Sequence, residues 1–447
     1  MPVRPLLLAV VALTGCGRVD LTADSCALQA EVDPCQEEDC QSSRSFQLAS
    51  TGIQATPNFD DEPFYSFAAS DLAVDVDVVA IHEDFYGIPW DEFLAGEDPP
   101  RAWVEVMDGL VEAVADKPVF LSLQLVGGSN RAFLGARTQV LDDETLGSSE
   151  AEWSDLCYDF DAAEDADEII EGFVAYAEWM IDRFDPVWLN PAIEMNLFYQ
   201  ACPDQWDALV RAEGEIHDAI KASHSDLVVF PSFVLETLYG LDPDCTDSAE
   251  DCLEDVADEY EENYAALAEV KRDRFAISTY PFGYTSMARV EDVPEGWFTG
   301  PSELGSEQLI IAETGWNSAP VNVKSITCGG CEVWREFGCQ EQADYFSRVV
   351  AEADVHDIEL VTWWSSRDLL PSGVSGTCRY SGLPREWRAP LRVFRKYLGC
   401  YLGEIVFKLW GTMGIRTYDG DPKGPIFPLW EAARTRPFSD GGDDTGR

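Results

Sequence analysis

Two glutamates in this chain stand at the ends of segments that look like buried strands. Glu313 follows the apolar run 309–312, which is typical of a strand buried on both faces and breaks soon afterwards at Gly315. Glu194 ends a similar segment, 187–194. A buried carboxylate without a partner is costly, so such a group usually has a partner or a chemical task. We therefore hypothesise that Glu194 and Glu313 meet at one site.

Two carboxylates that face each other are the groups that glycoside cleavage needs. One protonates the leaving oxygen, and the other attacks the anomeric carbon or activates a water molecule. Retention of configuration needs carboxyl groups ~5–5.5 Å apart, and inversion needs ~6.5–9.5 Å. The alternatives are structural: Glu313 paired with an arginine, and Glu194 capping its loop.

The elements that would position these residues are short apolar segments that alternate with longer amphipathic ones. This pattern indicates βα units and a parallel sheet. It predicts helices at 103–115, 169–183 and 426–433. The predicted strands lie at 46–53, 77–82, 118–125, 187–194, 227–233, 274–280, 309–318 and 358–364.

Eight strands interleaved with helices predict a single α/β domain, a closed (β/α)8 TIM barrel. An open doubly wound sheet is the alternative, but no glycine-rich fingerprint follows the first strand. In an eight-stranded barrel, strands four and seven lie across the lumen from each other, which would bring Glu194 and Glu313 together.

The cysteines support the barrel because nine of them follow predicted strands, in the loops of the catalytic face. Disulfides there would brace long loops. Cys245 with Cys252 is one pairing that proximity favours. The nine are Cys157, Cys202, Cys245, Cys252, Cys328, Cys331, Cys339, Cys378 and Cys400.

A family resemblance rests on the two glutamates and a few further residues. Glu194 and Glu313 resemble the acid/base and the nucleophile of the clan A glycoside hydrolases. The segment Glu-Thr-Gly-Trp-Asn-Ser at 313–318, which includes Trp316, is similar to the nucleophile segment of arabinogalactan endo-β-1,4-galactanases and plant-type β-1,3-glucanases. Tyr280 looks like the clan's strand-six tyrosine that hydrogen-bonds the nucleophile. The resemblance implies a retaining β-glycosidase in a divergent branch of the clan.

The same resemblance identifies candidate sugar contacts. Trp363 and Trp364 match the clan's strand-eight tryptophan, but adjacent strand residues cannot both face the lumen. The clan has asparagine directly before the acid/base, whereas this chain has Ile193, so Asn196 is the candidate replacement. Further substrate contacts are predicted at the barrel rim, for Trp316 and for the group His82, Asp84 and Gln124.

The charge of the chain limits the classes of substrate that it can bind. The formal charge is −53, from 83 acidic and 30 basic residues. A field of this sign repels nucleic acid and anionic polymers, so we expect a neutral carbohydrate and no nucleic acid.

No cofactor is predicted. A zinc site at Cys328, Cys331 and Cys339 is disfavoured because a structural zinc needs four ligands and no histidine follows nearby. We expect a monomer.

The N-terminus reads as a targeting segment. Arg4 precedes an apolar run that is too short to span a bilayer and ends in Leu-Thr-Gly-Cys, which resembles a bacterial lipobox. It implies a signal peptide at 1–15 and lipid on Cys16, although an ordinary signal peptide is the alternative. We expect an exported protein, lipid-anchored in the bacterial cell envelope, in which disulfides form.

The predicted organisation is then a lipidated, acidic, cysteine-containing tether at 16–44, a barrel domain at 45–436 and a flexible tail at 437–447. Three hypotheses for the barrel follow. The first is a glycoside hydrolase, the second a surface protein that binds glycan without cleaving it, and the third a structural envelope lipoprotein. A polar site at the barrel rim favours the first two, and an exposed apolar patch favours the third.

Overall fold

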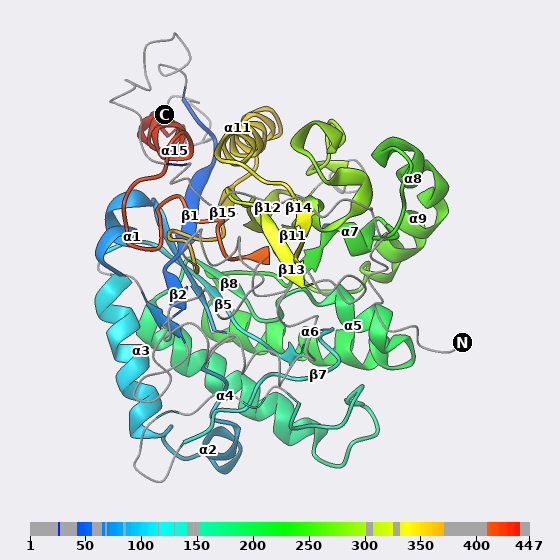
Figure 1. Ribbon diagram of the computed structural model, residues 1–447. Coiled ribbons are helices and arrows are strands. Elements are labelled where there is room, and N and C mark those ends of the chain that lie inside the picture. Colours follow the sequence, from blue (N-terminus) through cyan, green and yellow to red (C-terminus); the bar gives the residue numbers. More distant parts are fainter. Residues whose placement is uncertain are drawn as a thin grey trace, which may run out of the picture.

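The computed structural model shows strands at the centre and helices around them (Figure 1). The predicted lipidation site Cys16 and the predicted substrate contact Asp84 lie outside the described residues. The structure describes residues 26, 43–55, 65–67, 69–83, 86–114, 116–128, 130–140, 146, 150, 152–300, 307–324, 331–370 and 409–438.

The strands form one closed ring of parallel neighbours within the described residues. β1 pairs with both β15 and β4, and the order continues through β5, β8 and β9 and returns from β15 through β12 and β11 to β10. β9 and β10 are consecutive parts of the fifth barrel strand, so the ring closes with eight barrel strands. This confirms the predicted barrel. The strands are β1 (Gln47–Thr51), β4 (Val78–His82), β5 (Val119–Ser122), β8 (Trp188–Asn190), β9 (Val228–Val229), β10 (Ser232–Val234), β11 (Phe275–Thr279), β12 (Leu309–Thr314) and β15 (Leu360–Trp363).

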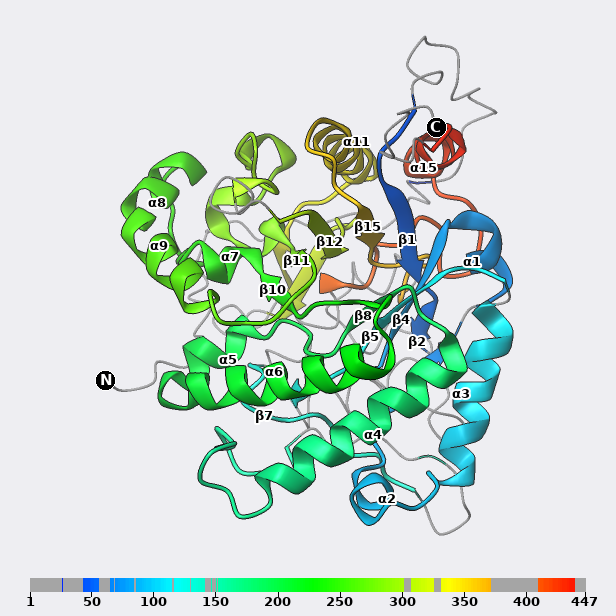
Figure 2. The ribbon, with the colours of Figure 1, turned by 180° about the vertical axis from the view of Figure 1, so that it is seen from behind.

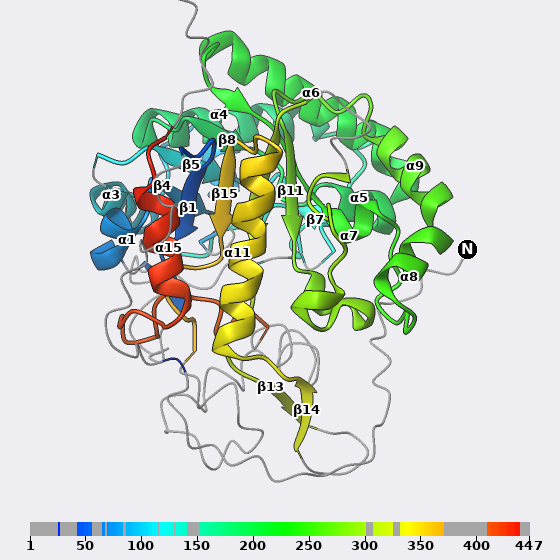
Figure 3. The same ribbon diagram turned by 90° about the horizontal axis from the view of Figure 1, so that it is seen from above.

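Helices cover the outside of this ring (Figures 2 and 3). The three predicted helices are present as α3, α4 and α15, and α15 lies beside α11. Three short hairpins extend the loops after strands one, three and seven. They are β2 (Ile53–Ala55) with β3 (Tyr65–Phe67), β6 (Val126–Gly127) with β7 (Phe133–Leu134), and β13 (Val321–Lys324) with β14 (Cys331–Arg335). The main helices are α1 (Ala69–Asp75), α3 (Arg101–Val114), α4 (Ala166–Phe184), α6 (Trp206–Ser223), α8 (Ala249–Asp255), α9 (Ala257–Ala266), α11 (Cys339–Val355) and α15 (Ile426–Thr435).

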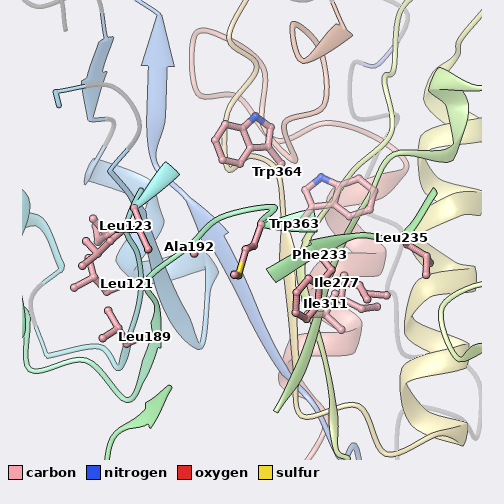
Figure 4. Packing of buried hydrophobic residues seen from close by; sticks show 14 of the residues in the cluster. Leu121, Leu123, Leu189, Ala192, Phe233, Leu235, Ile277, Ile311, Trp363 and Trp364 are labelled. Atoms are coloured by element: carbon pink, nitrogen blue, oxygen red, sulfur yellow. The ribbon is translucent and has the colours of Figure 1, made fainter. Parts of the chain in front are cut away.

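The core has two layers because side chains alternate along each strand. A small cluster takes a buried residue from each of the eight barrel strands, and it fills the barrel interior. Residues between these positions face the helices and form the larger cluster. Figure 4 shows Leu121 and Leu189 on one side of the ring and Ile277 and Ile311 on the other. The interior cluster is Ala49, Val78, Ala80, Phe120, Trp188, Phe230, Ala276, Ile310, Ala312 and Leu360.

Disulfides brace the loops after the strands, as predicted. Cys245 pairs with Cys252 in the loop after strand five, and Cys157 pairs with Cys202 between the loops after strands three and four. Cys26 pairs with Cys339 at the start of α11. The segment predicted as a tether is therefore covalently joined to the barrel at this residue.

Candidate active site

A bulge in β12 determines where Glu313 points. Ile311 and Glu313 pair with the consecutive residues Ile277 and Ser278 of β11, so β12 carries one extra residue there. Ala312 belongs to the interior cluster, and regular alternation would turn the next side chain outward toward the helices. A bulge re-aims the side chain that follows it. Glu313 consequently faces the same end of the barrel interior as Tyr280 and His82.

Glu313 is buried and held at both carboxylate oxygens. The Tyr280 hydroxyl donates to Oε2 at 3.0 Å, and Nε2 of His82 lies 3.2 Å from Oε1. Burial acts to raise the pKa of Glu313, but the charge and hydrogen bond of His82, the charge of Arg131 and the Tyr280 hydroxyl outweigh it. The pKa of Glu313 is lowered as a result. The arrangement holds Glu313 as a carboxylate, the form that a nucleophile needs.

The two adjacent tryptophans of strand eight divide between core and site. Trp363 faces the helices, is fully buried and donates from its indole nitrogen to the carbonyl of Met413 at 2.8 Å. Trp364 turns the other way, and its ring meets His82 edge-on at 5.0 Å. Trp364 therefore lies at the site, whereas the predicted sugar contact at Trp363 is corrected to a packing role.

Glu194 is placed by a turn rather than by strand alternation, which corrects the predicted extent of strand four. β8 ends at Asn190, because Pro191 follows and a proline has no N–H to donate to a neighbouring strand. Glu194 adopts a left-handed conformation with φ 55°, and its N–H donates to Oγ of Ser232 at 3.0 Å. Asn190 donates to the same oxygen at 3.0 Å. Ser232 thus fixes the turn that presents Glu194.

Arg131 connects the two glutamates electrostatically. Its guanidinium lies 3.3 Å from Oε2 of Glu194, and its charge also lowers the pKa of Glu313. Burial and the charges of Glu313 and Glu194, in that order, raise the pKa of Tyr280 well above its ordinary value. Both carboxylates therefore act on the same groups, and the structure brings together Glu194, Glu313, Tyr280 and His82.

The fold has known counterparts among solved structures. The barrel is similar to glycoside hydrolases of the GH5 family, in clan A. GH5_18 from Streptomyces cattleya in complex with GlcNAc shares 14% identity at a TM-score of 0.50, with 88% of this chain and 80% of that chain covered. A variant of that protein in complex with Manb1-4GlcNAc shares 13% identity at a TM-score of 0.49 and covers 87% of this chain and 80% of its own.

An endo-laminarinase from Formosa shares 12% identity at a TM-score of 0.47, with 91% of this chain and 92% of that chain covered. At these identities the likeness concerns the fold. The sequence matches no model of a known protein family. A search of curated proteins finds no match.

Two predicted contacts brace loops through their side-chain amides. Oε1 of Gln124 accepts a hydrogen bond from the backbone N–H of Ala136 at 2.9 Å, next to the β6–β7 hairpin. Asn196 begins α5 (Asn196–Ala201), and its amide both donates to the carbonyl and accepts from the N–H of Val234, at 2.9 and 2.8 Å. Asn196 thus holds the end of β10, a different role from the predicted replacement of the sugar-binding asparagine.

The tryptophan of the Glu-Thr-Gly-Trp-Asn-Ser segment belongs to the core. Trp316 is fully buried and packs against Tyr345 with ring centroids 4.8 Å apart. A side chain with no exposed surface cannot contact a sugar, so the predicted substrate role of Trp316 is corrected to packing. Asn317 instead fastens a distant segment, since it donates to Leu409 and accepts from the N–H and the hydroxyl of Thr412.

Three residues at the site were missed from the sequence. Arg131 follows the sequence Gly-Gly-Ser-Asn, and the available signal was that only two cations, Arg131 and Arg137, lie in the long loop after strand three of so acidic a chain. Glu236 comes soon after the apolar segment of strand five, as Glu313 follows the apolar run 309–312 of strand seven, and was therefore also recognisable. Trp410 meets Tyr280 edge-on at 6.0 Å and hydrogen-bonds to it. It stands almost a hundred residues after Glu313, so no local pattern indicated its place.

The described residues contain no cluster of three or more histidine, cysteine, aspartate or glutamate side chains arranged to hold a metal ion. Among the helices that the structure describes, none combines the length and the apolar composition that crossing a membrane requires.

Proposed function

We propose that this protein is a retaining β-glycoside hydrolase acting on a neutral polysaccharide or oligosaccharide. The observation that carries the proposal is the setting of Glu313. The carboxylate sits at the carboxyl end of strand seven, is held by Tyr280 and His82, and has a lowered pKa. Glu194, across the barrel, provides the second carboxyl group. The similarity of the barrel to clan A glycoside hydrolases supports this reading at the level of the fold.

In the proposed mechanism, Glu313 attacks the anomeric carbon while Glu194 protonates the leaving oxygen. Water then hydrolyses the glycosyl–enzyme intermediate, with Glu194 acting as the base. Tyr280 orients one oxygen of Glu313 through its hydroxyl, and His82 contacts the other. Because the interactions with His82, the charge of Arg131 and the Tyr280 hydroxyl lower the pKa of Glu313, it stays ionised in spite of its burial.

The remaining elements of the proposal come from the sequence. The net charge of −53 favours a neutral sugar as the partner and disfavours nucleic acid. The lipobox-like segment supports export, cleavage before Cys16 and lipid anchoring in the bacterial cell envelope. The proposal needs no cofactor and treats the protein as a monomer.

The proposal is tested by hydrolysis of a panel of β-glucans, β-mannans and β-galactans. Wild type is compared with Glu313→Ala and with a control, Glu307→Ala, which changes a carboxylate just before the start of the same strand. We expect loss of turnover in Glu313→Ala and full activity in the control. NMR of the first-formed products should show the β-anomer. Equal rates for wild type and Glu313→Ala on every hydrolysed substrate would remove Glu313 from the mechanism.

A second candidate function, glycan binding without cleavage, is favoured by one observation. Glu194 is ion-paired with Arg131, and a carboxylate held by a cation resists the protonation that a general acid needs. Ile193, which stands in place of the clan's asparagine, also favours binding without cleavage. Saturable binding of a glycan in isothermal titration calorimetry, with no product after prolonged incubation, would establish this function over hydrolysis.

A further inference from the structure

Glu236 carries a buried carboxyl group that interacts electrostatically with Glu194, one of the two proposed catalytic glutamates. Glu236 belongs to the short helix α7 (Leu235–Leu238), which follows β10 directly and lies beside β11 (Figure 2). Its side chain is buried, and Oε1 accepts two hydrogen bonds, from the hydroxyl of Thr279 at 2.7 Å and from the N–H of Tyr280 at 2.8 Å. The carboxyl group of Glu236 therefore fixes the end of β11 through hydrogen bonds. One of them comes from the backbone N–H of Tyr280, whose hydroxyl donates to Glu313.

The direction of these hydrogen bonds follows from the chemistry of the donors. The indole nitrogen of Trp297 can only donate, and it donates to Oγ1 of Thr279 at 2.9 Å. The hydroxyl proton of Thr279 is then directed at Glu236. Thr314, next to Glu313, donates to the carbonyl of Thr279 at 2.9 Å. The peptide between β11 and Tyr280 is consequently fixed from both sides.

We propose that Glu236 is a positioning residue of the active site, holding the Tyr280 phenol on Glu313 and adding a negative charge that favours the protonated form of Glu194. This inference rests on the proposed glycoside hydrolase function. Glu236 acts through Tyr280 and Glu194, and it needs no contact of its own with the sugar.

The charge state of Glu236 supports the second part of the proposal. Burial raises the pKa of Glu236 to about 7, hydrogen bonds from Thr279 and from backbone N–H groups oppose this rise, and the charge of Glu194 adds to it. Tyr284 and Tyr345 also face Glu236. Burial and the charge of Glu236 raise the pKa of both tyrosines, so they stay neutral. Glu236 therefore changes charge near neutral pH.

A Coulomb interaction between two groups is mutual. Since negative Glu194 resists ionisation of Glu236, negative Glu236 equally resists ionisation of Glu194. A general acid must hold its proton until the leaving group departs. Ionised Glu236 thus disfavours a second negative charge on Glu194, whose carboxylate also lies 3.3 Å from the guanidinium of Arg131.

The test uses two substitutions that separate the hydrogen bonds from the charge. Glu236→Gln keeps a carbonyl oxygen that accepts from Thr279 and Tyr280 but is neutral at every pH. Glu236→Leu removes the acceptor as well. The control is Glu213→Gln, which makes the same chemical change at another buried glutamate. Glu213 is near Lys271 and Arg272, at the opposite end of β11.

The readouts are kcat and KM across pH 4–9 on the best substrate of the panel. For Glu236→Gln we expect an alkaline limb of the kcat/KM profile that moves to lower pH, with kcat near the optimum little changed. For Glu236→Leu we expect kcat to fall roughly 10- to 100-fold, with a smaller change in KM. Glu213→Gln should leave the profile unmoved. If Glu236→Leu fails to fold, the alkaline limb of Glu236→Gln decides alone.

The outcomes separate this inference from the proposed function. Turnover by wild type, together with an unmoved alkaline limb in Glu236→Gln, would overturn the role of Glu236 and leave the hydrolase intact. Absence of turnover by wild type on the whole panel would overturn both.

Discussion

Glu213 makes the stability of this protein depend on pH in a way that the structure predicts. It lies on α6 with its side chain fully buried. Burial raises the pKa of its carboxyl group from 4.5 to about 8, although the charges of Lys271 and Arg272 oppose this rise. Near neutral pH the buried group is therefore mostly protonated, whereas in the unfolded chain it is ionised.

The direction and the size of the change in the free energy of unfolding with pH follow from proton linkage. Between the unfolded and folded pKa values, the folded state binds more protons, so stability falls as pH rises from about 4.5 to about 8. At 1.36 kcal/mol per pH unit, this difference corresponds to roughly 5 kcal/mol of destabilisation once both states are ionised. The many acidic residues also raise carboxyl pKa values in the unfolded chain, so the measured effect should be smaller than this bound.

The perturbation is Glu213→Gln, which keeps the shape of the side chain and removes its titration. Urea unfolding of wild type and variant, with disulfides intact, should give similar midpoints at pH 5, where Glu213 is protonated. At pH 9 the variant should be the more stable protein, by an amount on the order of 3 kcal/mol. A difference between the two proteins that is the same at pH 5 and pH 9 would refute the assignment of a buried, neutral carboxyl group.

Three further perturbations test the site and its supports. Tyr280→Phe removes a hydrogen bond to the Glu313 carboxylate, so kcat/KM should fall roughly 10- to 100-fold, and the acid limb of its pH profile should move to higher pH because the pKa of Glu313 rises. Lys423→Met leaves Asp368 buried without its 2.8 Å ion-pair partner, and urea denaturation should show a loss of about 3–5 kcal/mol. Loss of the Cys157–Cys202 disulfide, which closes a loop of 45 residues, should cost up to about 4 kcal/mol by the same assay. A midpoint unchanged in either of the last two variants, or a pH profile unmoved in the first, would contradict these assignments.

The barrel was predictable because its signals are local. Each barrel strand is a short apolar run whose two faces are both buried. In β11, for example, Ala276 faces the barrel interior and Ile277 faces the helices. Glu313 was predictable for the same reason, since it ends an apolar run. Cys245 and Cys252 pair across a short stretch, so sequence proximity was informative.

The orientation of the site residues was not predictable, because it depends on backbone irregularities and on distant partners. Strict alternation along β12 would turn the Glu313 side chain outward. The bulge that β12 forms against β11 and β15 turns it toward the barrel interior instead. Trp316 was predicted to contact substrate because the segment 313–318 resembles a nucleophile segment. Residues 316–318 instead pack in the core and anchor a distant segment, since Asn317 hydrogen-bonds to Leu409, next to Trp410. No pattern within one segment encodes that contact.

The disulfide Cys157–Cys202 cross-links the loops after strands three and four, which carry the ion pair of the site. Arg131 and Glu194 form the ion pair at the site, and both adopt the left-handed conformation, at φ 53° and 55°, which non-glycine residues rarely occupy. Such strain persists only where neighbouring contacts impose it. The N–H of Cys157 donates to the carbonyl of Ala132, directly after Arg131, at 2.7 Å. Its disulfide partner, Cys202, ends the helix that begins two residues after Glu194. One covalent bond therefore ties together the two strained loops that present the pair.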